Sequence, residues 1–199
     1  MPDLLLNHLK KHIQLTETEE HLILSSIQMR RFKRGDFLTK EGEVNRYTNF
    51  IVTGSAKVYY IDQQGQEHII QLGIKEWWIG DFSSFITQTK GILYTEALTV
   101  TETASFSYDI LQELYNKVPA LERFFRLLTQ KAYAAFHRRV LESLSMDAEQ
   151  RYIAFRTSYP EMDQQLSQKD IAAYLGISAE FLSKIKKRIV EKQKTEYNR

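Results

Sequence analysis

The sequence predicts an α+β chain in which a double-stranded, jelly-roll-like antiparallel β-roll with flanking helices precedes a long helix and an all-α domain. Three observations favour this fold. Short β-rich runs separated by glycine turns occupy residues 37–106, as in antiparallel rolls. A helical period continues unbroken over residues 119–144, and two short helical patterns meet at Gly176. The expected units are residues 1–118, 119–144 and 145–199.

Composition limits the class of protein. With 199 residues, 43% of them hydrophobic, the chain is long enough for one large or two small domains with a buried core. The absence of cysteine excludes disulfides, thiolate zinc sites and cysteine-ligated iron–sulfur clusters. The N-terminus lacks the apolar core and cleavage site of a signal peptide, and no apolar run approaches membrane-spanning length. We therefore expect a cytoplasmic protein with no membrane partner.

The N-terminal residues 3–30 show a helical period. Leu4, Leu5 and Leu9 fall on one stripe, and Thr16 precedes an acidic turn, which is typical of the start of a second helix. From Arg31 onward the apolar period changes to that of strands. Strands are expected over residues 37–39, 47–52, 56–62, 67–72 and 93–106.

A long helix is predicted to begin at Pro119, because proline is favoured in the first helical turn. One apolar stripe steps by three and four residues, as a coiled-coil seam does, and its small alanines favour a homodimer. A single core helix is the alternative. The predicted dimer seam is Phe125, Leu128, Ala132 and Ala135, and the residues expected to face the roll are Phe124, Leu127, Phe136 and Val140. Further helices are expected over residues 110–115 and 149–159, with a link over residues 161–166.

Two helices with a tight turn are predicted over residues 167–190. Ser167 and Ser178 are typical N-cap residues, and Gly176 can take the positive φ that ends the first helix. Five residues have the types and the spacing of a DNA-binding helix-turn-helix: polar, small, glycine, apolar and apolar. An ordinary helical hairpin is the alternative. The five residues are Gln168, Ala172, Gly176, Leu182 and Ile185.

The second of these helices is strongly basic. From residue 179 to the C-terminus, seven Lys or Arg residues stand against three acidic ones, in a chain whose net charge is only +2. A local excess of this kind attracts phosphate, so the predicted partner is double-stranded DNA. Glu180 can accept from cytosine and Lys184 can donate to guanine, whereas Arg188 is placed for phosphate. The predicted DNA-binding residues are Ser178, Ala179, Glu180, Ser183, Lys184, Lys187 and Arg188.

Several stretches resemble those of one superfamily. Residues 34–36 (RGD) and 40–43 (KEGE) are similar to the first turns of a cyclic-nucleotide-binding-type roll, and residues 50–55 (FIVTGS) to its central strand. Residues 60–68 are similar to the following hairpin, and residues 77–82 (WWIGDF) take the place of the phosphate-binding cassette. With the helix-turn-helix, the sequence resembles the Crp/Fnr superfamily of bacterial transcription regulators, in the short form common in Bacteroidetes-type bacteria, without room for a β-hairpin wing.

The resemblance implies a homodimer whose two second helices enter successive major grooves about 34 Å apart, on a near-palindromic operator. It also implies that the roll senses a small-molecule effector and that the protein contacts RNA polymerase. The expected effector pocket comprises Gly80, Asp81, Phe82, Lys90, Tyr94 and Thr95.

The sequence departs from the members that bind cyclic AMP. Asp81 stands in place of the glutamate for the ribose hydroxyl, and residues 89–95 lack the arginine that holds the cyclic phosphate. Lys90 could supply a positive charge, but unlike arginine it cannot bind a phosphate through two parallel hydrogen bonds. We therefore expect no cofactor and no binding of cyclic AMP in the usual way, with a cyclic-nucleotide-responsive regulator as the alternative.

Two other classes of protein are alternatives. A cupin-like metal enzyme needs closely spaced histidines with a glutamate, whereas the five histidines here are scattered without paired spacing. An interaction module without DNA binding leaves the basic second helix unexplained. The sequence therefore predicts no metal site, no catalytic residue and no enzyme activity.

Overall fold

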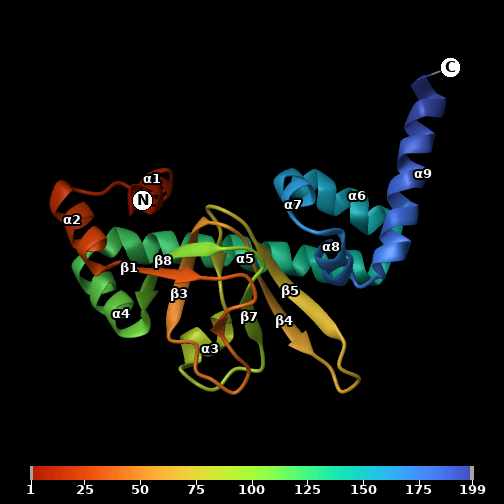
Figure 1. Cartoon of the computed structure of the whole chain (residues 1–199). Helices are drawn as coiled ribbons and strands as arrows, with labels where there is room; N and C mark the ends of the chain where they lie inside the picture. Colours follow the sequence, from red (N-terminus) through yellow and green to blue (C-terminus); the bar gives the residue numbers. More distant parts are fainter. Residues whose placement is uncertain (1, 198–199) are drawn as a thin grey trace.

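A computed structural model describes residues 2–197 and confirms the predicted α+β fold class. Helices α1, α2 and α4 gather at one end of a β-roll, the long helix α5 runs alongside it, and the helices of the C-terminal domain lie at the other end (Figure 1). Among the described residues, no helix has the length and apolar character needed to cross a membrane. The helices around the roll are α1 (Pro2–Lys10), α2 (Glu17–Ser26), α3 (Phe82–Thr87), α4 (Tyr108–Lys117) and α5 (Pro119–Ser145).

The roll consists of two four-stranded antiparallel sheets, with the strand orders β1-β8-β3-β6 and β2-β7-β4-β5. The strands are β1 (Gln28–Phe32), β2 (Phe37–Thr39), β3 (Tyr47–Thr53), β4 (Ala56–Ile61), β5 (Glu67–Gly73), β6 (Trp78–Ile79), β7 (Tyr94–Ala97) and β8 (Thr101–Ser107). The sequence missed β1 and β6, and it merged β7 with β8. Residues 28–30, which we expected to be helical, pair as a strand with β8.

The turn between β3 and β4 depends on Gly54. Its φ is +86°, a conformation that glycine adopts without steric cost. A Cβ at this position would lie 2.4 Å from the carbonyl oxygen of Val100. Only glycine therefore lets this turn pack against the loop before β8.

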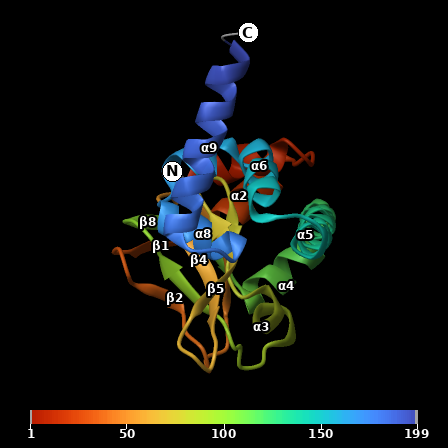
Figure 2. The ribbon, with the colours of Figure 1, turned by 90° about the vertical axis from the view of Figure 1, so that its right-hand side faces the viewer.

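The first half of α5 completes the core at one end of the roll. Leu121, Phe124 and Phe125 are buried there, and the ring centroids of Trp78 and Phe125 are 5.0 Å apart. The ring centroid of Trp78 is also 5.4 Å from that of Phe50 of β3, so Trp78 packs the roll. Figure 2 shows α5 nearly end-on beside the roll. This packing fixes the direction in which the rest of α5 leaves the roll.

The C-terminal domain has four helices among the described residues. The segment that we predicted as a link forms α7, because Pro160 occupies the first helical turn, where its missing N–H costs nothing. The domain shares a core with the outer face of the roll, in which Ile69 and Leu72 of β5 join Ile171 of α8 and Ile185 of α9. The four helices are α6 (Ala148–Ser158), α7 (Pro160–Gln165), α8 (Gln168–Leu175) and α9 (Ala179–Tyr197).

His8 gives the fold an expected pH dependence. Burial among Phe50 and Phe124, together with His12 and Lys11, lowers the pKa of His8 below its ordinary value of 6.5, against an opposing effect of Glu76. The unfolded chain therefore binds this proton at a higher pH than the folded one, and the free energy of unfolding falls as the pH drops below about 6.5.

The melting temperature of the wild-type protein should fall when the pH is lowered from about 7.5 to about 5.5, and we expect a smaller fall for His8→Gln. Thermal unfolding at both pH values measures this effect. His21→Gln, at an exposed position of α2, is the matched control. An equal loss in wild type and in His8→Gln would contradict the assignment.

Candidate nucleic-acid interface

Helices α8 and α9 form a helix-turn-helix whose ends are set by local hydrogen bonds. The hydroxyl of Ser167 accepts from the backbone N–H of Asp170 and so caps α8. Gly176 ends α8 with a φ of 70°, and Ser178 caps α9 by accepting from the N–H of Phe181. Leu182 and Ile185 of α9 are fully buried against the domain core. These contacts fix which face of α9 points outward.

The outward face of α9 has most of the predicted DNA-binding residues. Glu180, Lys184 and Lys187 are exposed on it, and Ser183 is half-buried at its edge. Ser178 is exposed at the cap, whereas Ala179 is half-buried behind it. Lys184 and Lys187 make no salt bridge within 4.0 Å in the part of the chain that the structure describes. The face therefore combines one carboxylate, one hydroxyl and two cations.

Three other cations of α9 are paired within the domain, which sequence reasoning missed. Lys186 donates to Asp163 of α7 over 3.1 Å. Arg188 and Lys192 both donate to Glu149 of α6, over 3.1 and 2.6 Å. Arg188 was predicted to contact phosphate, but it lies on the flank of α9 and is held by Glu149. The paired residues are 23 to 43 positions apart, so no local pattern indicates them.

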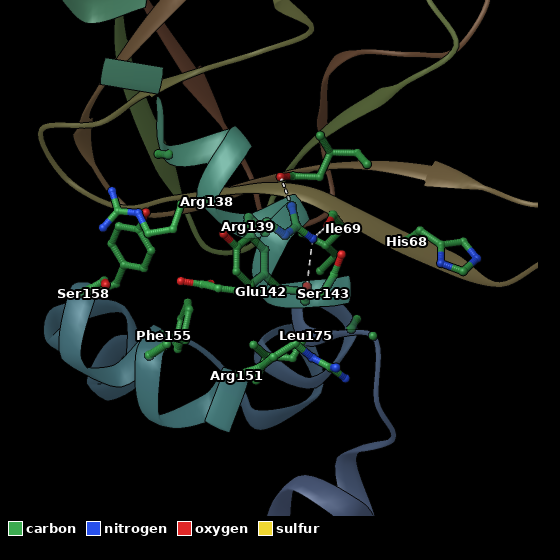
Figure 3. Close-up of a pocket in the computed structure, with 17 residues that line it drawn as sticks. His68, Ile69, Arg138, Arg139, Glu142, Ser143, Arg151, Phe155, Ser158 and Leu175 are labelled. Carbon is green, nitrogen blue, oxygen red and sulfur yellow. Dashed lines mark hydrogen bonds between the residues drawn. The ribbon is translucent and has the colours of Figure 1, made fainter. Parts of the chain in front are cut away.

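Arg139 of α5 ties the roll to the helix-turn-helix (Figure 3). Its guanidinium donates to the carbonyl oxygens of Ile69 and Ile70 in β5, over 2.7 and 2.6 Å. It also donates to the carbonyl of Tyr174 over 2.8 Å and lies 3.9 Å above the Tyr174 ring. Burial lowers the pKa of Arg139, and the C-terminal end of α8 favours a cation there. One side chain therefore joins α5, β5 and α8.

A cavity of about 210 Å³ lies beside Arg139, between α5, α6, α8 and β5 (Figure 3). Arg138 and Glu142 of α5 line it together with Phe155 of α6. Its volume is below the roughly 300 Å³ at which ligand pockets usually begin. We therefore interpret it as loose packing at the junction between the roll and the C-terminal domain.

The predicted dimer seam needs correction. Phe125 is buried in the roll core, Leu128 packs against that core, and Ala135 lines the junction cavity. Of the four residues only Ala132 is exposed. The first part of this stripe, Phe125 and Leu128, meets the chain's own roll, because the same spacing serves packing within a chain and between chains.

A different apolar stripe of α5 is exposed. Phe136 and Val140, which we expected to face the roll, point to solvent, and Leu144 is 79% exposed. The stripe also includes Tyr133 and Leu141 and steps by three and four residues. A contiguous apolar face on a long helix is typical of a surface that a partner covers.

The expected effector pocket also needs correction. Tyr94 and Thr95 are adjacent on β7 and so point to opposite faces of the sheet: Thr95 is fully buried opposite Val58, whereas the Tyr94 hydroxyl donates to Glu41. Asp81 is buried and caps α3 by accepting from the N–H of Ser84. Gly80, next to Asp81, lies close to Asn45: a Cβ on Gly80 would be 3.1 Å from the side-chain nitrogen of Asn45. Phe82 and Lys90 are exposed. The six residues therefore do not line one pocket.

The histidines are closer than the sequence indicated. The rings of His8 and His12 have centroids 5.7 Å apart, so these two histidines are neighbours in the fold. No group of three or more His, Asp or Glu side chains with the geometry of a metal site occurs among residues 2–197. Both rings instead pack against Phe124 of α5.

A β-roll of two antiparallel sheets is joined by the long helix α5 to a helix-turn-helix whose outward face is basic. The cyclic nucleotide-binding domain family matches residues 29–118. The anaerobic regulatory protein of Haemophilus influenzae is 26% identical over 77% of this chain, which spans 63% of that protein. The fumarate and nitrate reduction regulatory protein of Vibrio cholerae is 26% identical over 86% of this chain and 72% of its own length.

Among solved structures, FixK2 from Bradyrhizobium japonicum aligns with a TM-score of 0.71 at 19% identity, covering 84% of this chain and 86% of its own. The chain is thus similar in sequence to bacterial regulatory proteins, and it shares its fold with FixK2.

Proposed function

We propose that this protein is a homodimeric transcription regulator that reads a near-palindromic operator with the outward face of α9. The observation that carries the proposal is the arrangement of α8 and α9, which buries Leu182 and Ile185 and leaves Lys184 and Lys187 exposed on one face. Glu180 accepts from cytosine and Lys184 donates to guanine on this face, while Ser178 and Ser183 contact the backbone or base edges.

The exposed stripe of α5 supports a dimer. Pairing Phe136, Val140 and Leu144 with the same residues of a second copy buries an apolar face that is otherwise in water. A two-fold axis along α5 brings two recognition helices to one face of the DNA, where successive major grooves are about 34 Å apart. Binding to DNA implies a cytoplasmic site of action, RNA polymerase is the expected protein partner, and no catalytic role is proposed.

The roll is the proposed sensor of a small-molecule effector other than cyclic AMP. Asp81 is engaged as the cap of α3, and residues 80–95 contain no arginine for a cyclic phosphate. A buried phosphate anion without a fixed bidentate cation is poorly compensated for its lost hydration. We therefore propose that the protein uses no cyclic nucleotide as a cofactor.

We expect calorimetric titration with cyclic AMP to give no saturable heat at micromolar concentrations. The same titration in the presence of DNA checks whether a bound conformation opens a site. Saturable micromolar binding in either titration would contradict this account of the roll.

DNA binding itself is tested with a mixed-sequence duplex at several salt concentrations. We expect the affinity to fall linearly on a plot of log K against log salt, with a slope near −0.9 per phosphate contacted. Lys187→Ala should reduce the slope, whereas Lys33→Ala, an exposed cation of the roll, should not. If no DNA is bound at low salt, the proposed function is wrong.

A further inference from the structure

Glu149 lies between the recognition helix and the domain that presents it. Its Oε1 accepts from Nζ of Lys192 over 2.6 Å, and its Oε2 accepts from Nη1 of Arg188 over 3.1 Å. The side chain of Glu149 is only 17% exposed, whereas those of Arg188 and Lys192 are 55% and 62% exposed. The acid is therefore the inner partner, and the two cations stay accessible from outside.

The charge of Glu149 is stabilised from two directions. Glu149 stands in the first turn of α6, after the N-cap Asp147, where the helix dipole favours a negative group. Hydrogen bonds from Lys192 and then Arg188 hold its pKa below its ordinary value. The carboxylate thus remains ionised at neutral pH and needs no DNA to keep it so.

The two cations that Glu149 holds lie beside those that face outward. Arg188 follows Lys187 in the chain and lies one turn after Lys184, and Lys192 lies one turn further along α9. A phosphate at this flank meets two side chains that already have an anion at hydrogen-bonding distance. Each new phosphate contact must therefore replace an ion pair within the protein, so its net gain is small.

We propose that Glu149 acts as an internal competitor of DNA phosphate for Arg188 and Lys192, which limits the affinity of the regulator for DNA of any sequence. The inference rests on the proposed DNA-binding function. It gives Glu149 a purpose beyond packing: a regulator with fewer phosphate contacts is held less by the many non-specific sites of a genome.

The test is the substitution Glu149→Gln, which keeps the shape of the side chain and removes its charge. We expect tighter binding to both operator and non-operator DNA, and a plot of log K against log salt that is steeper by about 0.9 for each cation released. A folding defect lowers DNA binding and cannot produce this gain. Glu149→Asp, which keeps the charge, should stay closer to wild type.

The matched control is Glu161→Gln, which removes one negative charge from an exposed position of the same domain. If Glu149→Gln changes affinity and slope no more than this control does, the proposal is overturned. A loss of operator affinity in a folded Glu149→Gln protein also overturns it, because the carboxylate then only positions α9. If neither wild type nor Glu149→Gln binds DNA, the proposed function fails together with the inference.

Discussion

Replacing Val140 and Leu144 by glutamate is expected to convert the proposed dimer into monomers and to reduce operator affinity by at least about 100-fold. Both side chains lie on the exposed apolar stripe of α5, and Leu144 is 79% exposed in the single chain. In the dimer each introduced carboxylate would be buried in an apolar interface, opposite the same carboxylate of the second copy. Burial of such an unpaired charge costs several kcal/mol per ion. A monomer presents one recognition helix and loses the second half-site. Light scattering gives the mass, and fluorescence anisotropy gives the operator affinity.

The matched control for this double variant is Val140→Leu with Leu144→Met, which keeps the stripe apolar at similar volume. The control should remain a dimer with near wild-type DNA affinity. Circular dichroism should show the same helix content in all three proteins, because both positions point away from the chain's own core. A Val140→Glu, Leu144→Glu protein that still has the mass of a dimer would refute the assignment of the interface.

Lys184→Ala is expected to cost about 1–3 kcal/mol on the preferred operator and to relax the choice of base at one position. Lys184 is exposed on the outward face, in the first half of α9, where side chains enter the groove when the start of the helix leads. Affinities for operator and non-operator duplexes at several salt concentrations measure the effect. Equal losses on both duplexes would show that Lys184 only neutralises phosphate.

Arg188→Ala is the comparison for Lys184→Ala. Loss of an arginine that contacts phosphate weakens binding to all DNA alike and reduces the salt slope by about one unit. Because Glu149 already holds Arg188 over 3.1 Å, the structure predicts a smaller change in slope. Lys187→Ala, which removes an outward cation without a described salt bridge, should change the slope more.

The helix-turn-helix was predictable because its signals are local. The cap residues Ser167 and Ser178 and the turn at Gly176 act within four residues of their own positions, and the structure shows each in that role. The start of α5 at Pro119 is predictable for the same reason. Most strands were found from their period and glycine turns.

The burial of Phe125 and the separation of the expected pocket residues differ from the predictions for identifiable reasons. The α5 helix has two apolar stripes, and a period alone does not say which one meets the roll. Phe125, expected at the seam, is buried in the roll, whereas Phe136, expected to face the roll, is exposed. Tyr94 and Thr95 were grouped by closeness in sequence, although neighbours on a strand face opposite ways. The ion pairs of Glu149 join residues 39 and 43 positions apart and depend on the folded domain.

The central claim is that a dimer presents two α9 helices to one DNA site. Selection of bound duplexes from a random-sequence pool by the wild-type protein tests this claim most directly. The account predicts enrichment of a near-palindromic site whose half-site centres are separated by about one helical turn, roughly 34 Å, or a multiple of it. Enrichment of isolated half-sites, or of no sequence at all, would contradict it.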